Sequence, residues 1–233
     1  MKAFLLSAGV GSRLRPITDT IPKCMVEIDG RPLLEIWLDA FHRAGVDEVL
    51  VNLHHLPGPV LEHVAARSGP PAVHTVFEPE LLGSAGTLVA NRHWIETEEF
   101  FLACNADNLT DFDLRELIDT HREGGAIATL TAFHSETPSA GGVLELGEFD
   151  EVIGFTEKPE NPVSDLVNAG MYAFSPAVLD EITRPAPVDI GYSLLPKLVG
   201  KARVVPVKGY FRDIGTPEAY RRASEEWPER AAR

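Results

Sequence analysis

The sequence predicts an α/β protein whose central sheet is mixed but mostly parallel and is flanked by helices. Short apolar runs of strand length alternate with amphipathic helical segments through the first 77 residues, which is the pattern of a parallel sheet. Two of these runs lead into loops of small residues, at the edge where a parallel sheet places its ligands. The 233 residues, 44% of them hydrophobic, suffice for one large domain with a substantial core.

The first half of the chain supplies the parallel part of the sheet. Strands are expected at residues 3–6, 25–28, 46–53 and 72–77. The first helix is expected to begin at residues 31–32, with proline in its first turn, and to end at Gly45. A second helix should carry Val60, Leu61 and Val64 on its apolar face. This succession of strands and helices predicts a Rossmann-like arrangement.

The second half continues the sheet and then changes character. Strands are expected at 100–108 and 126–133, separated by a helix whose N-cap is Asp111 or Asp113. Residues 142–146 and 151–155 form two antiparallel strands, so we expect an α+β insertion at about 134–175 that covers one edge of the sheet. Thr216 and Pro217 begin the last helix. No linker interrupts the pattern, and residues 1–233 are therefore expected to form a single domain.

Composition narrows the classes of partner. The formal net charge of −14 argues against nucleic acid and against an anionic membrane surface. No apolar run approaches the length of a membrane span, and the N-terminus lacks the pattern of a signal peptide. Two cysteines give neither a disulfide framework nor metal-ligand spacing, so a cytoplasmic protein is expected. The oligomeric state, monomer or homo-oligomer, stays open.

The loop after the first strand has the features of a polyphosphate site. Its small residues are Ser7, Ala8, Gly9, Gly11 and Ser12. Cationic Arg13 and Lys23 follow, and the first 24 residues carry a formal charge of +3 in an acidic protein. Backbone N–H groups and side-chain cations together suit phosphate oxygens. Neither the dinucleotide fingerprint nor the P-loop pattern fits the spacing of these residues.

Three further polar segments are candidates, each with an ordinary alternative. The loop 78–88, with Gly83 and Gly86, suits a flat or charged ligand but by itself is more typical of an ordinary strand-to-helix connection. Asp107 ends a buried strand, where it could hold Mg²⁺ or simply cap a turn. Glu157 and Lys158 are adjacent, as in many solvated turns.

Taken in order, these segments resemble the sugar nucleotidyltransferases. The opening string matches G-x-G-[ST]-R-L-x-P-x-T followed by Pro22-Lys23, and Leu-Gly-Ser-Ala-Gly occupies 82–86. Glu-Lys-Pro stands at 157–159, N-x-G-x-Y at 168–172 and D-I-G-T-P-x-x-Y at 213–220. The family's Gly-Asp is Ala106-Asp107 here, a departure that keeps the aspartate. The resemblance spans residues 1 to about 224.

The resemblance implies the nucleotide-diphospho-sugar transferase fold and assigns roles to the residues. It implies an enzyme that transfers a nucleotidyl group from an NTP to a sugar 1-phosphate. Arg13, Lys23, Asp107 and Asp213 would be catalytic, the two aspartates as ligands of Mg²⁺. Nucleotide binding falls to Ser7, Ala8, Gly9, Gly11, Ser12, Arg13, Lys23, Glu78, Gly83, Ala85 and Gly86. Sugar phosphate binding falls to Gly142, Glu157, Lys158 and Asn168.

The identity of the base and sugar is a separate question. The form of the 82–86 loop resembles that of guanylyltransferases acting on mannose 1-phosphate and related hexose or heptose phosphates, so GTP is the expected donor. A uridylyl- or thymidylyltransferase of the same fold is one alternative. The other is a non-catalytic sugar-nucleotide-binding regulatory subunit, which would be expected to have lost an aspartate or Lys23.

Overall fold

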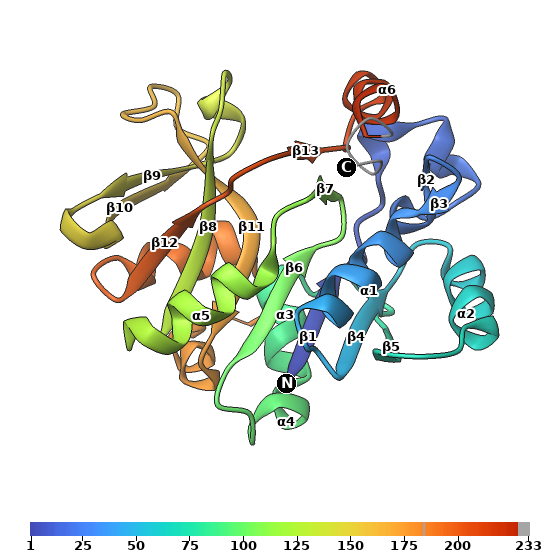
Figure 1. The fold of residues 1–233 in the computed structure, drawn as a ribbon, viewed down its shortest axis with the longest axis horizontal. Helices are drawn as coiled ribbons and strands as arrows, with labels where there is room; N and C mark the ends of the chain where they lie inside the picture. Colours follow the sequence, from blue (N-terminus) through green and yellow to red (C-terminus); the bar gives the residue numbers. More distant parts are fainter. Residues whose placement is uncertain (184, 228–233) are drawn as a thin grey trace.

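The computed structural model of the protein describes residues 1–183 and 185–227. A sheet of nine strands runs through these residues (Figure 1). The strands are β1 (Lys2–Leu6), β4 (Glu48–Leu53), β5 (Ala72–Phe77), β6 (Phe101–Asn105), β8 (Ala128–His134), β9 (Gly142–Leu146), β10 (Val152–Glu157), β11 (Leu166–Phe174) and β12 (Ala202–Pro206).

The sheet is mixed and mostly parallel, as the sequence predicts. Its main path is β10-β9-β11-β6-β1-β4-β5, and β8 joins it beside β11, with β12 next to β8. Strands β6, β1, β4 and β5 are parallel, and β12 is parallel to β8. Strand β11 is antiparallel to both β6 and β8, and β9 and β10 form an antiparallel pair. The parallel strands therefore end at one common edge.

Helices cover both faces of the sheet. They are α1 (Leu33–Arg43), α2 (Pro57–Ala66), α3 (Ser84–Ala90), α4 (Arg92–Ile95), α5 (Leu114–Gly124) and α6 (Pro217–Glu226). Ala3 and Leu5 of β1 pack with α1 and α5, whereas Phe4 packs with α3 on the other face. Such two-sided burial explains why β1 is a continuous apolar run. None of the helices within 1–183 and 185–227 is both long and apolar enough to cross a membrane.

Two small ribbons complete the edge where the parallel strands end. One joins β2 (Glu27–Ile28) to β3 (Arg31–Pro32), and the other joins β7 (Asn108–Thr110) to β13 (Phe211–Asp213). In Figure 1, β13 crosses above β7, and the chain then enters α6 beside the β2–β3 ribbon. The Tyr220 hydroxyl of α6 donates to the Glu27 carbonyl at 2.9 Å. This hydrogen bond holds α6 beside the β2–β3 ribbon, while the pairing of β13 with β7 places β13 next to the segment that follows β6.

The expectations for residues 25–32 were wrong in detail. Only Glu27 and Ile28 form a strand, because Lys23–Met25 is a 3-10 turn. The first helix begins at Leu33, because Pro32 pairs with Glu27 in the β2–β3 ribbon. A strand expected from residue 46 begins at Glu48.

The structure also tests the expected positions of Leu61 in the second helix and of Asp111 or Asp113 as an N-cap. Leu61 of α2 is 45% exposed, contrary to the expectation that it lies on the buried face. The N-cap of α5 is Asp113, whose carboxylate accepts from the Arg115 N–H at 3.0 Å. Asp111 instead accepts from the Tyr210 N–H at 2.6 Å, which holds β13 beside β7.

Residues 134–175 contain strands β9, β10 and β11 and two 3-10 turns, at Pro138–Ala140 and Glu148–Asp150. Because β11 hydrogen-bonds to both β6 and β8, it belongs to the central sheet. The assignment of 1–233 to a single domain stays a prediction.

Candidate active site

Two cavities open at the edge where the parallel strands end. The first, which we call the β11-side cavity, has a volume of about 490 Å³. The second, the α3-side cavity, has a volume of about 710 Å³. Asn105, Asp107 and Lys158 line both, so the two cavities meet at these side chains.

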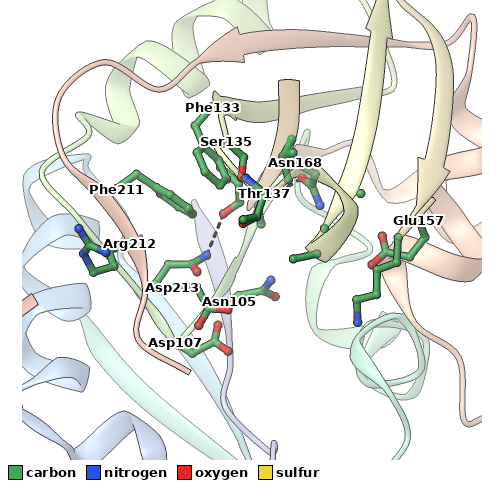
Figure 2. Close-up of a pocket in the computed structure, with 18 of the residues that line it drawn as sticks. Asn105, Asp107, Phe133, Ser135, Thr137, Glu157, Asn168, Phe211, Arg212 and Asp213 are labelled. Atoms are coloured by element: carbon green, nitrogen blue, oxygen red, sulfur yellow. Dashed lines mark hydrogen bonds between the residues drawn. The ribbon is translucent and has the colours of Figure 1, made fainter. Parts of the chain in front are cut away.

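Asp107 and Asp213 come from distant parts of the chain and lie side by side (Figure 2). Asp107 follows β6, and Asp213 ends β13, where it pairs in register with Asn108. The Ile214 N–H donates to the Asp107 carbonyl at 3.0 Å and fixes the two segments. The β7–β13 ribbon thus delivers a second carboxylate to the end of β6.

Two cations face these carboxylates. Lys23 Nζ lies 2.7 Å from Asp107 Oδ2 and 3.7 Å from Asp213 Oδ1, and its side chain is only 12% exposed. Arg13 Nη2 lies 3.7 Å from Asp213 Oδ2. The four side chains form a compact charged cluster where the cavities meet.

Gly215 allows this cluster to be compact. Its N–H donates to Asp213 Oδ1 at 2.6 Å. A Cβ at this position would lie 2.7 Å from Asp213 Oδ1, 2.9 Å from Arg13 Nη2 and 3.0 Å from Lys23 Nζ. Any side chain at residue 215 would therefore push the charged groups apart.

The electrostatics of the paired aspartates suit a divalent cation. Burial raises the pKa of Asp213, and the charge of Asp107 raises it further, against the opposing effect of Lys23. A cation held by both carboxylates would relieve this repulsion, and hard oxygen ligands suit Mg²⁺. No group of three or more His, Cys, Asp or Glu side chains placed for a metal occurs among the described residues.

The β11-side cavity is also lined by Glu157, Lys158 and Asn168, and Figure 2 labels Glu157 and Asn168. Burial raises the pKa of Glu157, with the charge of Lys158 opposing. Lys158 has a φ of 47°, uncommon for a residue with a side chain, and its N–H donates to the Gly141 carbonyl at 3.0 Å. Asn168 donates through Nδ2 to the Tyr172 hydroxyl at 2.6 Å. The Lys158 backbone and the Asn168 side chain are thus each held by a hydrogen bond.

The loop between β5 and α3 forms one wall of the α3-side cavity. Gly83 has a φ of +76°, and a Cβ there would overlap the Val188 carbonyl. The N–H groups of Ala85 and Gly86 both donate to the Val188 oxygen at 3.0 Å. The Glu78 side chain is 3% exposed, and its carboxylate accepts from groups inside the protein. This wall of the cavity is therefore formed by a loop whose backbone is fixed by hydrogen bonds to Val188 and Glu78.

The residues expected from sequence fall into four sets. The β11-side cavity is lined by Arg13, Asp107, Gly142, Glu157, Lys158, Asn168 and Asp213. The α3-side cavity is lined by Ala8, Gly9, Glu78, Gly83, Asp107 and Lys158. Ser7 and Lys23 line a small recess of about 50 Å³ beneath Asp107. Gly11, Ser12, Ala85 and Gly86 line neither of the two large cavities.

Sequence reasoning missed several residues of the site. These include Asn105, Phe133, Ser135, Phe211 and Arg212 in the β11-side cavity, and Ser84, Pro187 and Asp189 in the α3-side cavity. Asn105 could have been found, because it ends a buried strand two residues before Asp107. The rings of Phe133 and Phe211 are in tilted contact, with centroids 4.4 Å apart, and no local sequence pattern connects these two segments.

Comparison with known proteins agrees with this architecture. A family model described as nucleotidyl transferase matches residues 2–230. The mannose-1-phosphate guanylyltransferase catalytic subunit beta of Danio rerio is 32% identical over 226 residues, covering 94% of this chain and 62% of that protein. The UTP–glucose-1-phosphate uridylyltransferase of Synechocystis sp. is 35% identical over 215 residues, covering 85% of this chain and 55% of that protein. The chain therefore spans under two thirds of the length of these relatives.

Solved structures show the same fold. The crystal structure of HddC from Yersinia pseudotuberculosis complexed with GMP-PN superimposes with a TM-score of 0.81 at 24% identity, covering 97% of this chain and 99% of that one. The mixed sheet and its edge cavities thus define an α/β protein with the nucleotide-sugar transferase fold. The chain belongs to the nucleotidyl transferase family.

Proposed function

We propose that this protein transfers a nucleotidyl group from an NTP to a sugar 1-phosphate and releases pyrophosphate. One observation carries the proposal: Asp107, which lines both cavities, is clustered with Lys23 and Asp213. The α3-side cavity would take the nucleotide and the β11-side cavity the sugar 1-phosphate, so the α-phosphorus and its attacking oxygen would meet beside these groups. The names of the relatives support this class of reaction.

The residues present can perform this transfer by positioning and charge neutralisation. The nucleophile is already a phosphate anion, so no protein base is required, and in-line alignment lowers the barrier. Lys158 would hold the sugar phosphate, while Glu157 and Asn168 would orient the sugar through its hydroxyls. Arg13 and Lys23 would neutralise charge on the triphosphate and on the departing pyrophosphate. Gly9 would allow the triphosphate to approach the backbone.

Mg²⁺ is proposed as the cofactor, with Asp107 and Asp213 as its protein ligands. When bound, the ion would supply electrostatic stabilisation of the transferring phosphate oxygens. Lys23 Nζ, 2.7 Å from Asp107, would then exchange this carboxylate partner for phosphate oxygens.

GTP is the proposed donor and mannose 1-phosphate, or a related hexose or heptose 1-phosphate, the proposed acceptor. Support comes from the form of loop 82–86 and from the guanylyltransferase names of relatives. UTP is the alternative that the Synechocystis relative favours, and dTTP is retained beside it. A regulatory subunit is less well supported, because Lys23, Asp107 and Asp213 are all present.

The test is a matrix of GTP, UTP, dTTP and ATP against glucose, mannose and heptose 1-phosphates, read as pyrophosphate release. We expect the largest kcat/KM with GTP and mannose or heptose 1-phosphate. A larger value with UTP or dTTP would correct the base and leave the reaction in place. Pyrophosphate release from none of the pairs would reject the proposed function.

We also propose where the protein is located and name the measurement that would give its oligomeric state. Cys24 and Cys104 are free and buried, which supports the cytoplasm as the location. Assembly as a monomer or a homo-oligomer is to be decided by light scattering.

A further inference from the structure

Asn52 lies at the end of β4, between the loops that follow β1 and β5. β4 pairs with β1 on one side and with β5 on the other, and all three strands are parallel. Adjacent strands are about 4.8 Å apart, so a side chain at the end of the middle strand can reach both neighbouring loops. The Asn52 side chain is only 4% exposed.

On one side, Asn52 holds the start of the glycine loop. Its Oδ1 accepts from the Ser7 N–H at 2.7 Å. The Ser7 hydroxyl donates to the Asn52 carbonyl at 2.6 Å. These two hydrogen bonds fix the point at which the chain leaves β1 and turns towards Ala8 and Gly9, which line the α3-side cavity.

On the other side, Asn52 holds the loop between β5 and α3. Its Nδ2 donates to Glu78 Oε1 at 2.9 Å and to the Thr87 hydroxyl oxygen at 3.0 Å. The Thr87 hydroxyl donates to Glu78 Oε1 at 2.6 Å, and Glu78 Oε2 accepts from the Leu82 N–H at 3.2 Å. The loop that carries Gly83 is therefore tied to the same amide group.

The chemistry of an amide is required at this position. Asn52 must accept on the Ser7 side and donate on the Glu78 side, and only an amide does both with one planar group. Aspartate would place a second carboxylate against the buried Glu78 carboxylate, with no donor between them. Alanine would leave both the Ser7 N–H and the Glu78 carboxylate without this partner.

The residues that follow Asn52 reach a further loop segment. His54 Nδ1 is 2.8 Å from the Glu78 carbonyl, and His55 Nε2 is 3.1 Å from the Thr18 carbonyl. Because a carbonyl only accepts, each of these ring nitrogens must carry its proton. Residues 52–55 thus contact the glycine loop, the β5–α3 loop and the segment that leads to Lys23.

We propose that Asn52 is a positioning residue that fixes the separation of the glycine loop and the β5–α3 loop, so that both contact one nucleotide. The inference rests on the proposed function, in which the α3-side cavity takes the NTP. Asn52 itself lines the α3-side cavity, but its amide is already hydrogen-bonded to Ser7, Glu78 and Thr87, so it would act through the two loops that it joins. Its effect should fall on NTP affinity rather than on the sugar phosphate, which binds in the other cavity.

The primary experiment is calorimetric titration with GTP of the wild type, Asn52→Ala and Asn52→Asp, beside the KM for the sugar 1-phosphate. We expect GTP affinity to fall fivefold or more in both variants, while the KM for the sugar phosphate stays within threefold. Asn91→Ala is the matched control, because Asn91 is buried, donates to the Thr87 carbonyl at 2.9 Å and does not line the α3-side cavity. Its GTP affinity should stay within threefold of the wild type.

A swapped pair separates positioning from general destabilisation. In Asn52→Asp combined with Glu78→Gln, the new glutamine can donate to the new aspartate, which restores the missing hydrogen bond with its polarity reversed. Relative to Asn52→Asp alone, the double variant should recover at least half of the lost binding free energy for GTP. This comparison also serves should Asn52→Ala fail to fold.

Several outcomes would overturn the inference. They are a loss of GTP affinity below fivefold in Asn52→Asp, an equal loss in Asn91→Ala at a matched melting temperature, or no recovery in the double variant. If the wild type binds none of the four NTPs, it is the proposed function that fails.

Discussion

The carboxylate of Glu157 lies against the backbone of Gly191, a residue 34 positions later in the chain. A Cβ at residue 191 would lie 2.5 Å from Glu157 Oε2 and 2.9 Å from its carboxyl carbon. On its other side, the same oxygen would lie 2.7 Å from a Cβ at Gly142. Two glycines from separate segments therefore leave just enough room for this one carboxylate.

Gly191→Ala should displace Glu157 and weaken binding of the sugar 1-phosphate. A contact under 3.0 Å must relax, and the flexible end of Glu157 is the group that can move. We expect the KM for the sugar phosphate to rise about tenfold, the scale of one lost hydrogen bond to a charged group. GTP affinity should change little.

The matched control is Gly58→Ala in α2, where a Cβ would meet nothing within 4 Å. Its KM values should equal those of the wild type. An unchanged KM in Gly191→Ala would show that Glu157 does not hold the sugar.

The fold was predictable where the hydrophobic periodicity of a segment agrees with the residues that begin and end it. The strand expected at 72–77 is β5 to the residue, and Thr216 caps α6 by accepting from the Ala219 N–H at 3.2 Å. The β2–β3 ribbon was missed because a proline at residue 32 is typical of the first turn of a helix. In the structure, Pro32 instead pairs with Glu27 in the ribbon. Local patterns carry no information on such pairing.

The candidate site was predictable only where its residues belong to compact strings. Asp107 and Asp213 are 106 residues apart in sequence, and each stands in its own recognisable string. Asn52 and Gly191 stand in none. An asparagine within an apolar run and a glycine within a helical turn gain meaning only once Ser7, Glu78 and Glu157 are placed beside them in space.

Loss of either carboxylate of the cluster should abolish most turnover without unfolding the protein. Asp107→Asn and Asp213→Asn should each lower kcat by about 10²-fold or more, because each removes charge that stabilises the transition state. EDTA should abolish wild-type activity and excess Mg²⁺ should restore it.

Asp39→Asn is the control for this pair, since Asp39 is surface-exposed and pairs with Arg31 at 2.6 Å. Circular dichroism of all three variants checks that they fold. Full activity of either cluster variant at saturating Mg²⁺ would remove its aspartate from the proposed metal site.

Lys23 and Lys158 should have different kinetic roles although both are single cations. Lys23→Ala should lower kcat strongly, because charge on the leaving pyrophosphate would be left uncompensated. Lys158→Ala should instead raise the KM for the sugar phosphate and lower turnover, because the nucleophile is no longer aligned. GTP affinity in Lys158→Ala should stay close to that of the wild type.

These expectations are checked by calorimetry with GTP and by steady-state kinetics. Lys201→Ala, whose Nζ pairs with Glu181 at 2.7 Å, is the surface control. Because Lys158 lines both cavities, the experiment is discriminating: equal losses of GTP and sugar phosphate binding would show that Lys158 contacts both substrates rather than the sugar phosphate alone.

The raised pKa of Glu157 predicts a specific dependence of sugar phosphate binding on pH. Burial raises this pKa above the ordinary 4.5, and the nearby charge of Asp189 adds to the effect while Lys158 opposes it. As pH falls from neutrality towards 4.5, Glu157 should therefore gain a proton at a higher pH than an ordinary glutamate does. The protonated side chain is a weaker acceptor of hydrogen bonds from the sugar hydroxyls. The KM for the sugar phosphate should rise over this range.

Glu157→Gln isolates this titration from that of the substrate phosphate, whose own second pKa is about 6. The KM of the variant divided by that of the wild type should be largest near pH 8 and should fall as pH decreases towards the raised pKa of Glu157. A ratio that is constant from pH 5 to 8 would contradict the assignment.

Stability should follow the same titration. Since the folded-state pKa is raised, ionising Glu157 costs folding free energy. This cost is fully present above the raised pKa and disappears as pH falls through it. The melting temperature of Glu157→Gln should therefore exceed that of the wild type at pH 8, and the difference should shrink at pH 5.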